Sequence, residues 1–372
     1  MSCDNNQQAF LTLVRAGLWE KDCRLSFFGE IDFNEIHRLA QEQSIVGLVA
    51  AGLEHVKDVM VPQKDALAFV GETLLLEQRN IAMNHFIGVL VDKLREADIY
   101  TLLVKGQGIA QCYERPLWRA CGDVDFFLSD NNYKKAAVLL SPISSSVDEE
   151  NAYNQHLSMT IDPWVVELHG TLRSGLWRGI DKALDEVQKA VFYKGKVRSW
   201  INGHTQVFLP SADEDVVFVF SHILQHFFKE GIGFRQICDW SRLLWTYRET
   251  IDVQLLYARL KHMGIMSEWR SFAVLAVDIL GMPADAMPFY SPKKRWKTKA
   301  DKILAFIIET GNFGHNRDYS YYKRYPYLVY KFISLWRHTQ DGFSYFSIFP
   351  LDAIKVWCQM IETGVSWAVK RK

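Results

Sequence analysis

Two aspartates separated by one residue are the strongest chemical signal in the sequence. Asp123 and Asp125 flank Val124, and three apolar residues follow at 126–128. Because residues i and i+2 of a strand point to one face, both carboxylates should converge on one spot beside a buried strand. Such carboxylates repel each other unless a cation lies between them, and Mg²⁺ is the hard divalent ion that suits oxygen ligands. A strand end with two solvated aspartates is the simpler alternative.

A third acid stands within another apolar stretch. Glu167 lies between Val166 and Leu168, where an unpaired charge would be costly, so we expect it to have a partner. Supplied by a neighbouring strand, its carboxylate would complete a site for two metal ions that clamp phosphates and activate an attacking oxygen. His169 should face the same side of this strand, either as part of the site or simply as a histidine at the strand end.

A glycine-containing turn precedes these acids. Lys105, Gly106 and Gln107 follow a short β-type run at 101–104 and lead into a helical run. Backbone N–H groups at such a turn can cradle phosphates, and the lysine adds positive charge. The turn matches neither the P-loop nor the dinucleotide-binding pattern. Arg119, just upstream of the aspartates, is expected to contact a triphosphate or to pair with the acidic cluster.

Together these residues resemble the polymerase-β-type nucleotidyltransferase superfamily, most of all its uncharacterised bacterial branch, the nucleotidyltransferase family 5 type. The resemblance covers residues 102–170, with a strand, a Lys-Gly turn, Arg-x-x-Gly-Asp-Val-Asp and a later Val-Glu-Leu-His-Gly. It implies that Asp123 and Asp125 ligate Mg²⁺ bound to a nucleoside triphosphate. It further implies that Glu167 helps to hold a second metal and activates the acceptor hydroxyl, while Lys105 and its glycine turn hold the phosphates.

One feature departs from the superfamily pattern. The superfamily usually has Gly-Ser at the turn, whereas this chain has Gly106-Gln107. The phosphate contact of the serine would have to come from Gln107, Lys105 or backbone amides. The implied reaction is in-line displacement at the α-phosphorus, with pyrophosphate leaving and ATP as the expected donor, onto an unidentified hydroxyl. The alternative is a regulatory or scaffold protein that binds nucleotide without catalysis.

Two further pairs with helical spacing lie in the C-terminal half. His222 and His226 share a helix face and could offer two metal ligands, but no acid stands at a spacing diagnostic of zinc. Arg235 and Asp239 are expected to form an intrahelical ion pair. We expect this helical hairpin to line the acceptor side of the cleft.

The segment 291–338 is basic and rich in aromatic residues. It holds eleven Lys and Arg against three acids, although the whole chain has 43 of each sign. The balanced total excludes a protein that binds polyanions by bulk charge. A basic helical face packed by its aromatics is the simplest explanation, and binding to nucleic acid, an anionic membrane surface or an anionic acceptor is the alternative. A nucleic-acid-processing enzyme is therefore a third possible function.

The elements that must position these residues fall into three predicted segments, at 1–97, 98–209 and 210–372. Helices are expected at 31–53, 66–97, 133–140, 211–229, 235–246, 252–261, 268–280, 301–309 and 327–336, and strands at 101–104, 123–128, 158–161 and 164–169. We therefore predict an α+β fold in which a small mixed-sheet nucleotidyltransferase core is flanked by N-terminal and C-terminal helical segments.

The sequence also bears on location. The N-terminal residues form no signal-peptide pattern, and no run approaches the roughly 18–20 apolar residues of a membrane span. The six cysteines show no Cys-x-x-Cys spacing, which is typical of reduced, buried thiols. These features predict a cytoplasmic protein with no membrane span.

Overall fold

The computed structural model describes residues 4–370 except 152, 194–195, 317–324, 326–328, 330–332 and 334–344. At its centre lies a mixed sheet of five strands in the order β1-β2-β5-β4-β3. The strands are β1 (Leu102–Val104), β2 (Asp123–Phe127), β3 (Ser146–Val147), β4 (His156–Ile161) and β5 (Trp164–His169). Strands β2 and β5 are parallel, and the other neighbours are antiparallel. The predicted α+β class is confirmed.

Alternation along β5 decides which side chains face the site. Trp164, Val166 and Leu168 are buried in an apolar cluster with one face of α4. Glu167 and His169 are half-buried on the opposite face, because successive side chains of a strand point to opposite sides. One face of the strand therefore packs in the apolar cluster, and the other face presents polar groups to the site.

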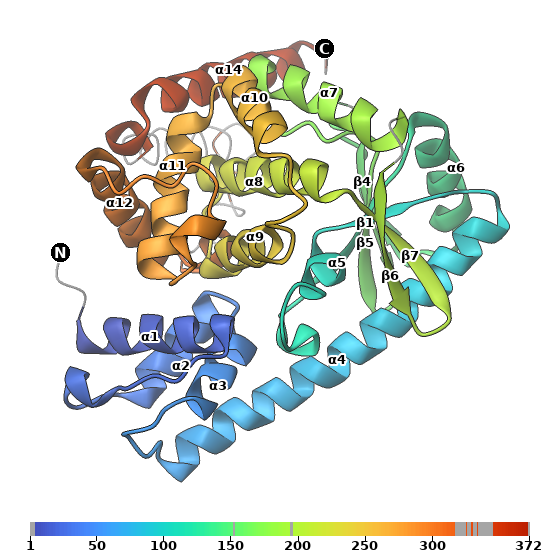
Figure 1. The fold of residues 1–372 in the computed structure, drawn as a ribbon. Coiled ribbons are helices and arrows are strands. Elements are labelled where there is room, and N and C mark those ends of the chain that lie inside the picture. The colour runs from blue at the N-terminus through green and yellow to red at the C-terminus, as the bar shows by residue number, and fades with distance from the viewer. Residues whose placement is uncertain are drawn as a thin grey trace.

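The N-terminal part is helical, but one predicted helix is wrong. Its helices are α1 (Asn5–Trp19), α2 (Phe33–Glu42), α3 (Val46–Glu54) and α4 (Gln63–Glu96). The apolar stripe expected as a single helix over 31–53 is divided between α2 and α3, since Ser44 has φ 55°, which no helix accommodates. Helix α4 runs from these helices to the sheet (Figure 1).

The sheet is bordered by further elements. These are α5 (Gly106–Ala110), α6 (Asp130–Leu140), α7 (Arg178–Tyr193) and a hairpin of β6 (Val197–Asn202) and β7 (Thr205–Pro210). Short 3₁₀ turns occur at Ser26–Phe28, Pro116–Trp118, Ser141–Ile143, Ala284–Ala286 and Asn312–Gly314. Strand β7 contacts both β1 and α4, so the hairpin holds the first strand of the sheet against the long helix. Helix α7 and this hairpin were not predicted, although the buried residues of α7 at 180, 183, 184, 187 and 191 have the apolar spacing of a helix.

The C-terminal part returns to helices, as predicted. They are α8 (Ala212–Lys229), α9 (Phe234–Thr246), α10 (Val253–Met263), α11 (Met266–Val274) with a π-helical turn at Leu275–Ile279, α12 (Lys294–Thr310) and α14 (Pro350–Lys370). The helix expected at 327–336 lies largely outside the described residues. No helix in the described part of the chain has both the length and the apolar character that crossing a membrane requires.

One apolar core joins the N-terminal and C-terminal helices. Within it, the buried Gln43 connects three parts of the chain. Its Oε1 accepts a hydrogen bond from the Phe234 amide of α9 (3.0 Å), and its Nε2 donates to the Ile307 carbonyl of α12 (3.0 Å). The division of the chain at residues 98 and 210 stays a prediction.

Candidate active site

The register of the sheet places two of the three predicted acids, Asp125 and Glu167, directly opposite each other. Asp125 of β2 is the partner of Glu167 on parallel β5 and of Val104 on β1. On the other side of β5, His169 is the partner of His156 on β4. Asp125 and Glu167 thus share one register position, and His169 and His156 share the position two residues further along β5. These four residues, with Lys105 directly after β1, are called the acidic row.

Contacts along this row tie acids to cations. Asp125 is only 2% exposed, and its Oδ1 lies 2.7 Å from Lys105 Nζ and 2.8 Å from His169 Nε2. Glu167 Oε2 lies 3.5 Å from His169 Nε2 and 3.1 Å from His156 Nε2. The partner expected for Glu167 is thus a pair of imidazoles.

The electrostatics of the row favour the charged forms of Glu167, His169 and Lys105. Burial opposes the charge of Glu167, but its hydrogen bonds with His156 and His169 hold its pKa well below the ordinary range. Burial also opposes protonation of His169, and the hydrogen bonds to Asp125 and Glu167 outweigh it and raise its pKa. The pKa of Lys105 is likewise raised against the effect of burial, first by Asp125 and then by Glu167.

Asp123 faces a pocket of about 500 Å³ between the sheet and the C-terminal helices. The charge of Asp125, followed by burial, raises the pKa of Asp123, and Asp123 has no ion-pair partner within the described residues. Negative charge is therefore in excess at this wall of the pocket. Oxygen donors with uncompensated negative charge fit a hard divalent cation, because such an ion relieves their repulsion.

Most of the predicted site residues line this one pocket. They are Lys105, Gly106, Arg119, Asp123, Asp125, His222, Arg235 and Asp239. Glu167 and His169 lie next to Asp125, through the contacts given above. Helices α8 and α9 therefore close the site opposite the sheet, where the predicted helical hairpin was expected.

Gln107 does not face the pocket. Its side chain is buried, and its Nε2 donates to Asn80 Oδ1 of α4 at 2.8 Å. The packing against α4 directs this side chain into the core, so of the three expected replacements for the phosphate contact of a serine, Lys105 and backbone amides are the two that stay predictions. Lys105 (φ 56°) and Gly106 (φ 41°) both have left-handed backbone, and a Cβ at Gly106 would lie 3.1 Å from the Cys121 sulfur. The tight turn places Lys105 over Asp125.

The expected ion pair between Arg235 and Asp239 is wrong. Asp239 instead binds Arg119 in a bidentate pair, with Nη2–Oδ2 at 2.5 Å and Nε–Oδ1 at 3.1 Å. Tyr113 donates its hydroxyl to the same carboxylate at 2.8 Å. The planar guanidinium matches a carboxylate in this geometry, and the pair joins the segment before β2 to α9.

Arg235 is left without a carboxylate among the described residues. Its Nη1 donates to the Ala120 carbonyl at 3.3 Å, its guanidinium carbon lies 5.4 Å from the Phe313 ring, and its buried Nε has no partner there. Burial, followed by the charge of Arg119, lowers its pKa. Both conditions favour the binding of an anion beside it.

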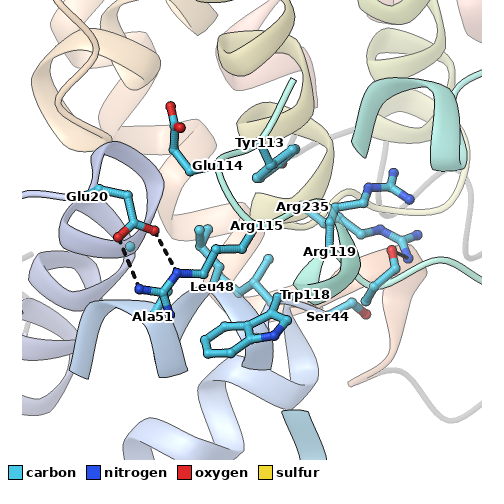
Figure 2. Close-up of a pocket in the computed structure, with 14 residues that line it drawn as sticks. Glu20, Ser44, Leu48, Ala51, Tyr113, Glu114, Arg115, Trp118, Arg119 and Arg235 are labelled. Carbon is cyan, nitrogen blue, oxygen red and sulfur yellow. Dashed lines mark hydrogen bonds and ion pairs between the residues drawn. The ribbon is translucent and has the colours of Figure 1, made fainter. Parts of the chain in front are cut away.

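A second pocket, of about 400 Å³, adjoins the first and shares these two arginines. Figure 2 shows Arg119 and Arg235 side by side, with Ser44 of the turn between α2 and α3 near them; Leu48 of α3 also lines the pocket. Its other basic residue, Arg115, is paired with Glu20 (Figure 2), Nε to Oε1 at 3.1 Å. Arg235 is therefore the arginine of this pocket that forms no ion pair with a described carboxylate.

The two histidines of α8 contact each other. Their Nε2 atoms are 2.9 Å apart, and Nδ1 of His226 lies 2.9 Å from Glu230 Oε2. Burial holds the pKa of His222 well below its ordinary value, so His222 faces the pocket as a neutral imidazole. The pair is not part of any cluster of three candidate metal ligands in the described chain.

The sequence analysis did not identify His156 as a site residue, although the expected pairing of the two strands could have placed it beside His169. The two-residue turn at Asp162-Pro163 makes Ile161 and Trp164 partners, and counting outward pairs His156 with His169. The strand was expected to begin only at residue 158, so this pairing was not drawn.

The basic segment is described only in part, because most of 317–344 lies outside the described residues. In the described part, Lys297 Nζ pairs with Asp278 Oδ2 at 2.9 Å, and Lys299 Nζ donates to Ser267 Oγ at 3.0 Å. Its binding to an anionic partner stays a prediction.

Comparison with known protein families gives a match over most of the chain. A family model described as an uncharacterised nucleotidyltransferase matches residues 29–281, which contain the acidic row, Arg119 and Arg235. Neither a curated protein nor a solved structure matches the chain. The resemblance inferred from the sequence motifs is thereby confirmed.

Proposed function

The chain belongs to the family of uncharacterised nucleotidyltransferases, and from this premise we propose that it transfers a nucleotidyl group from a nucleoside triphosphate to an acceptor hydroxyl. ATP is the expected donor. The observation that carries the proposal is the convergence of Asp123 and Asp125 on a pocket whose opposite wall holds Arg235, which forms no ion pair with a described carboxylate. One wall thus suits a cation and the opposite wall suits an anion. A triphosphate with a bound metal ion carries both kinds of charge.

Asp123, Asp125 and Glu167 are the residues that would hold Mg²⁺. When bound, Mg²⁺ neutralises charge on the phosphates and favours deprotonation of the attacking hydroxyl. The protein side chains around the metal site position the reacting groups. Lys105 fixes the Asp125 carboxylate and adds positive charge at the turn, while His169 orients Asp125 and Glu167 toward each other. In this arrangement the nucleotide is held for in-line displacement, with pyrophosphate leaving.

Arg235 is assigned to an anionic group of the substrates. Its guanidinium borders both pockets, so it can bind the triphosphate from one side or an acidic group of the acceptor from the other. Arg119 is less suited to this role, because its charge is already balanced by Asp239.

Pyrophosphate release in the presence of Mg²⁺, ATP and a panel of hydroxyl acceptors tests the proposal. The double substitution Asp123→Asn, Asp125→Asn should lower the rate by at least about 100-fold, the order of magnitude of losing a main electrostatic contributor. Asp148→Asn, at an exposed acid outside the pocket, is the matched control and should leave the rate unchanged. Undiminished turnover in the double variant would overturn the assignment.

The second candidate is a regulatory or scaffold protein that binds nucleotide without catalysis. It is favoured by the two cations that already contact Asp125 Oδ1, since they compete with a metal for that oxygen. This candidate predicts that calorimetry detects ATP binding while no acceptor supports pyrophosphate release.

A further inference from the structure

The hairpin of β4 and β5 brings together three side chains of the kind that bind transition metals. His156 and His169 are partners across the antiparallel pair, and Glu167 precedes His169 by two residues. All three side chains are partly exposed, at 32%, 15% and 23% respectively, and they share one face of the sheet. The backbone ladder therefore fixes the positions from which they extend.

Distances within this cluster are already close to those of a metal site. One candidate ligand atom from each residue lies within 4.8 Å of the other two. Glu167 Oε2 is 3.1 Å from His156 Nε2 and 3.5 Å from His169 Nε2. Ligands about 2.0–2.1 Å from a tetrahedral ion stand about 3.3 Å from one another, so two of the three separations need almost no change.

The donor types select the class of ion. Mg²⁺ keeps oxygen ligands and several waters, whereas imidazole nitrogen suits Zn²⁺, Co²⁺ and related ions. Two histidines and one carboxylate also leave a coordination position open, as in catalytic zinc sites. In the described chain, the ion-pair partners of Glu167 are these two histidines, so its carboxylate is the group that a metal ion on the imidazoles would meet first.

We propose that His156, Glu167 and His169 bind a first-row transition-metal dication of the Zn²⁺ and Co²⁺ type at the edge of the nucleotide pocket. The inference deepens the proposed function, because it gives nitrogen ligands to the second metal ion, the one next to Glu167. The role of this ion in catalysis rests on the proposed function. Asp125 Oδ1, 2.8 Å from His169 Nε2, is the neighbouring group that links this ion to the aspartate pair.

Titration of the full-length, chelator-treated protein with Co²⁺, followed by visible absorption, tests the site without nucleotide or turnover. We expect saturable ligand-field bands that Zn²⁺ removes and excess Mg²⁺ does not. His156→Gln should weaken Co²⁺ binding about tenfold or more, and its circular dichroism and melting temperature show whether the fold is kept. His204→Gln is the matched control, because His204 is 94% exposed and lies outside the cluster.

Three outcomes overturn the proposal: absence of the bands, equal binding by His156→Gln, and displacement of Co²⁺ by Mg²⁺ at comparable concentration. The first result leaves protonated imidazoles as the partners of Glu167, and the third leaves a site of carboxylates alone. The two proposals fail separately. Loss of turnover in the aspartate variant without Co²⁺ binding keeps only the transferase, whereas Co²⁺ binding dependent on His156 without any turnover keeps only the metal site.

Discussion

Asp125 and Glu167 stand opposite each other on the parallel strands β2 and β5, and a single nitrogen, His169 Nε2, lies 2.8 Å from one carboxylate and 3.5 Å from the other. Two acids in neighbouring strands would repel each other without such a group between them. The histidine is therefore part of what allows the acidic row to exist in a folded sheet.

Removal of this histidine should destabilise the protein in the absence of metal. His169→Ala leaves Asp125 and Glu167 without a shared partner, and we expect the free energy of unfolding to fall by about 1–3 kcal/mol. Urea denaturation of the metal-free protein measures the change. His204→Ala removes a surface histidine and should stay within about 0.5 kcal/mol of wild type; an equal stability of both variants would contradict the bridging role.

The pair of Arg119 and Asp239 should show strong coupling. Arg119→Met leaves a buried carboxylate unpaired, which costs about 3–5 kcal/mol. Replacing both partners with apolar residues, in Arg119→Met with Asp239→Leu, should recover much of that loss. A double-mutant cycle from denaturation midpoints gives the coupling energy, and simple additivity of the two single variants would contradict a direct pair.

A buried acid in α11 should make stability depend on pH. Burial, together with the carboxylate of Asp352 on α14, raises the pKa of Glu268 well above its ordinary value. The unfolded chain releases this proton near pH 4.5 while the folded chain keeps it, so stability falls as pH rises between the two pKa values, by up to about 1.4 kcal/mol per pH unit. Glu268→Gln should remove that slope and be more stable than wild type at pH 8.

Thermal melts across pH 5–9 measure this effect. Glu249→Gln alters an acid that is 82% exposed and should keep the slope of the wild type. Parallel curves for wild type and Glu268→Gln would show that Glu268 is ionised in the folded protein.

The crossing of α1 and α3 should not tolerate a methyl group. A Cβ added at Gly17 would lie 2.0 Å from the carbonyl oxygen of Leu48, so the helices would have to separate. Gly17→Ala should therefore cost at least about 2 kcal/mol, within the range of overpacked cores. Gly71→Ala, on an exposed face of α4 with open space around it, should instead stabilise by about 0.5–1 kcal/mol; a stable Gly17→Ala would place the helices further apart.

The alternation of apolar and polar residues predicted strands β2 and β5, because the sequence is regular in both segments. The alternation in 164–169 and the Asp-x-Asp of 123–125 gave the strands and the face of each acid, and the side-chain period of two is a property that a sequence displays directly. The periodicity of the C-terminal helices was equally readable, and it predicted α8 and α9 close to their observed bounds.

Partners that depend on tertiary packing could not be predicted. Asp239 was assigned to Arg235 because four residues separate them, yet the fold offers it Arg119, which lies 120 residues earlier in the chain. Gln107 shows the same limit, since its neighbours along the chain gave no sign that α4 would bury it. Spacing along one helix identifies possible neighbours, but long-range packing chooses among them.

Gln43 has a consequence for how the chain can be divided. Its amide accepts a hydrogen bond from the Phe234 amide of α9 and adds a second donor to the Ile307 carbonyl of α12, which also accepts from Gly311 N–H. A fragment that starts after residue 97 would therefore leave the Phe234 amide unpartnered and expose the apolar surface that α1–α3 cover. The orphaned amide would cost about 1–3 kcal/mol if it stayed buried. The N-terminal and C-terminal helices thus form one structural unit that should fold together, although the strands of the acidic row lie between them in the sequence.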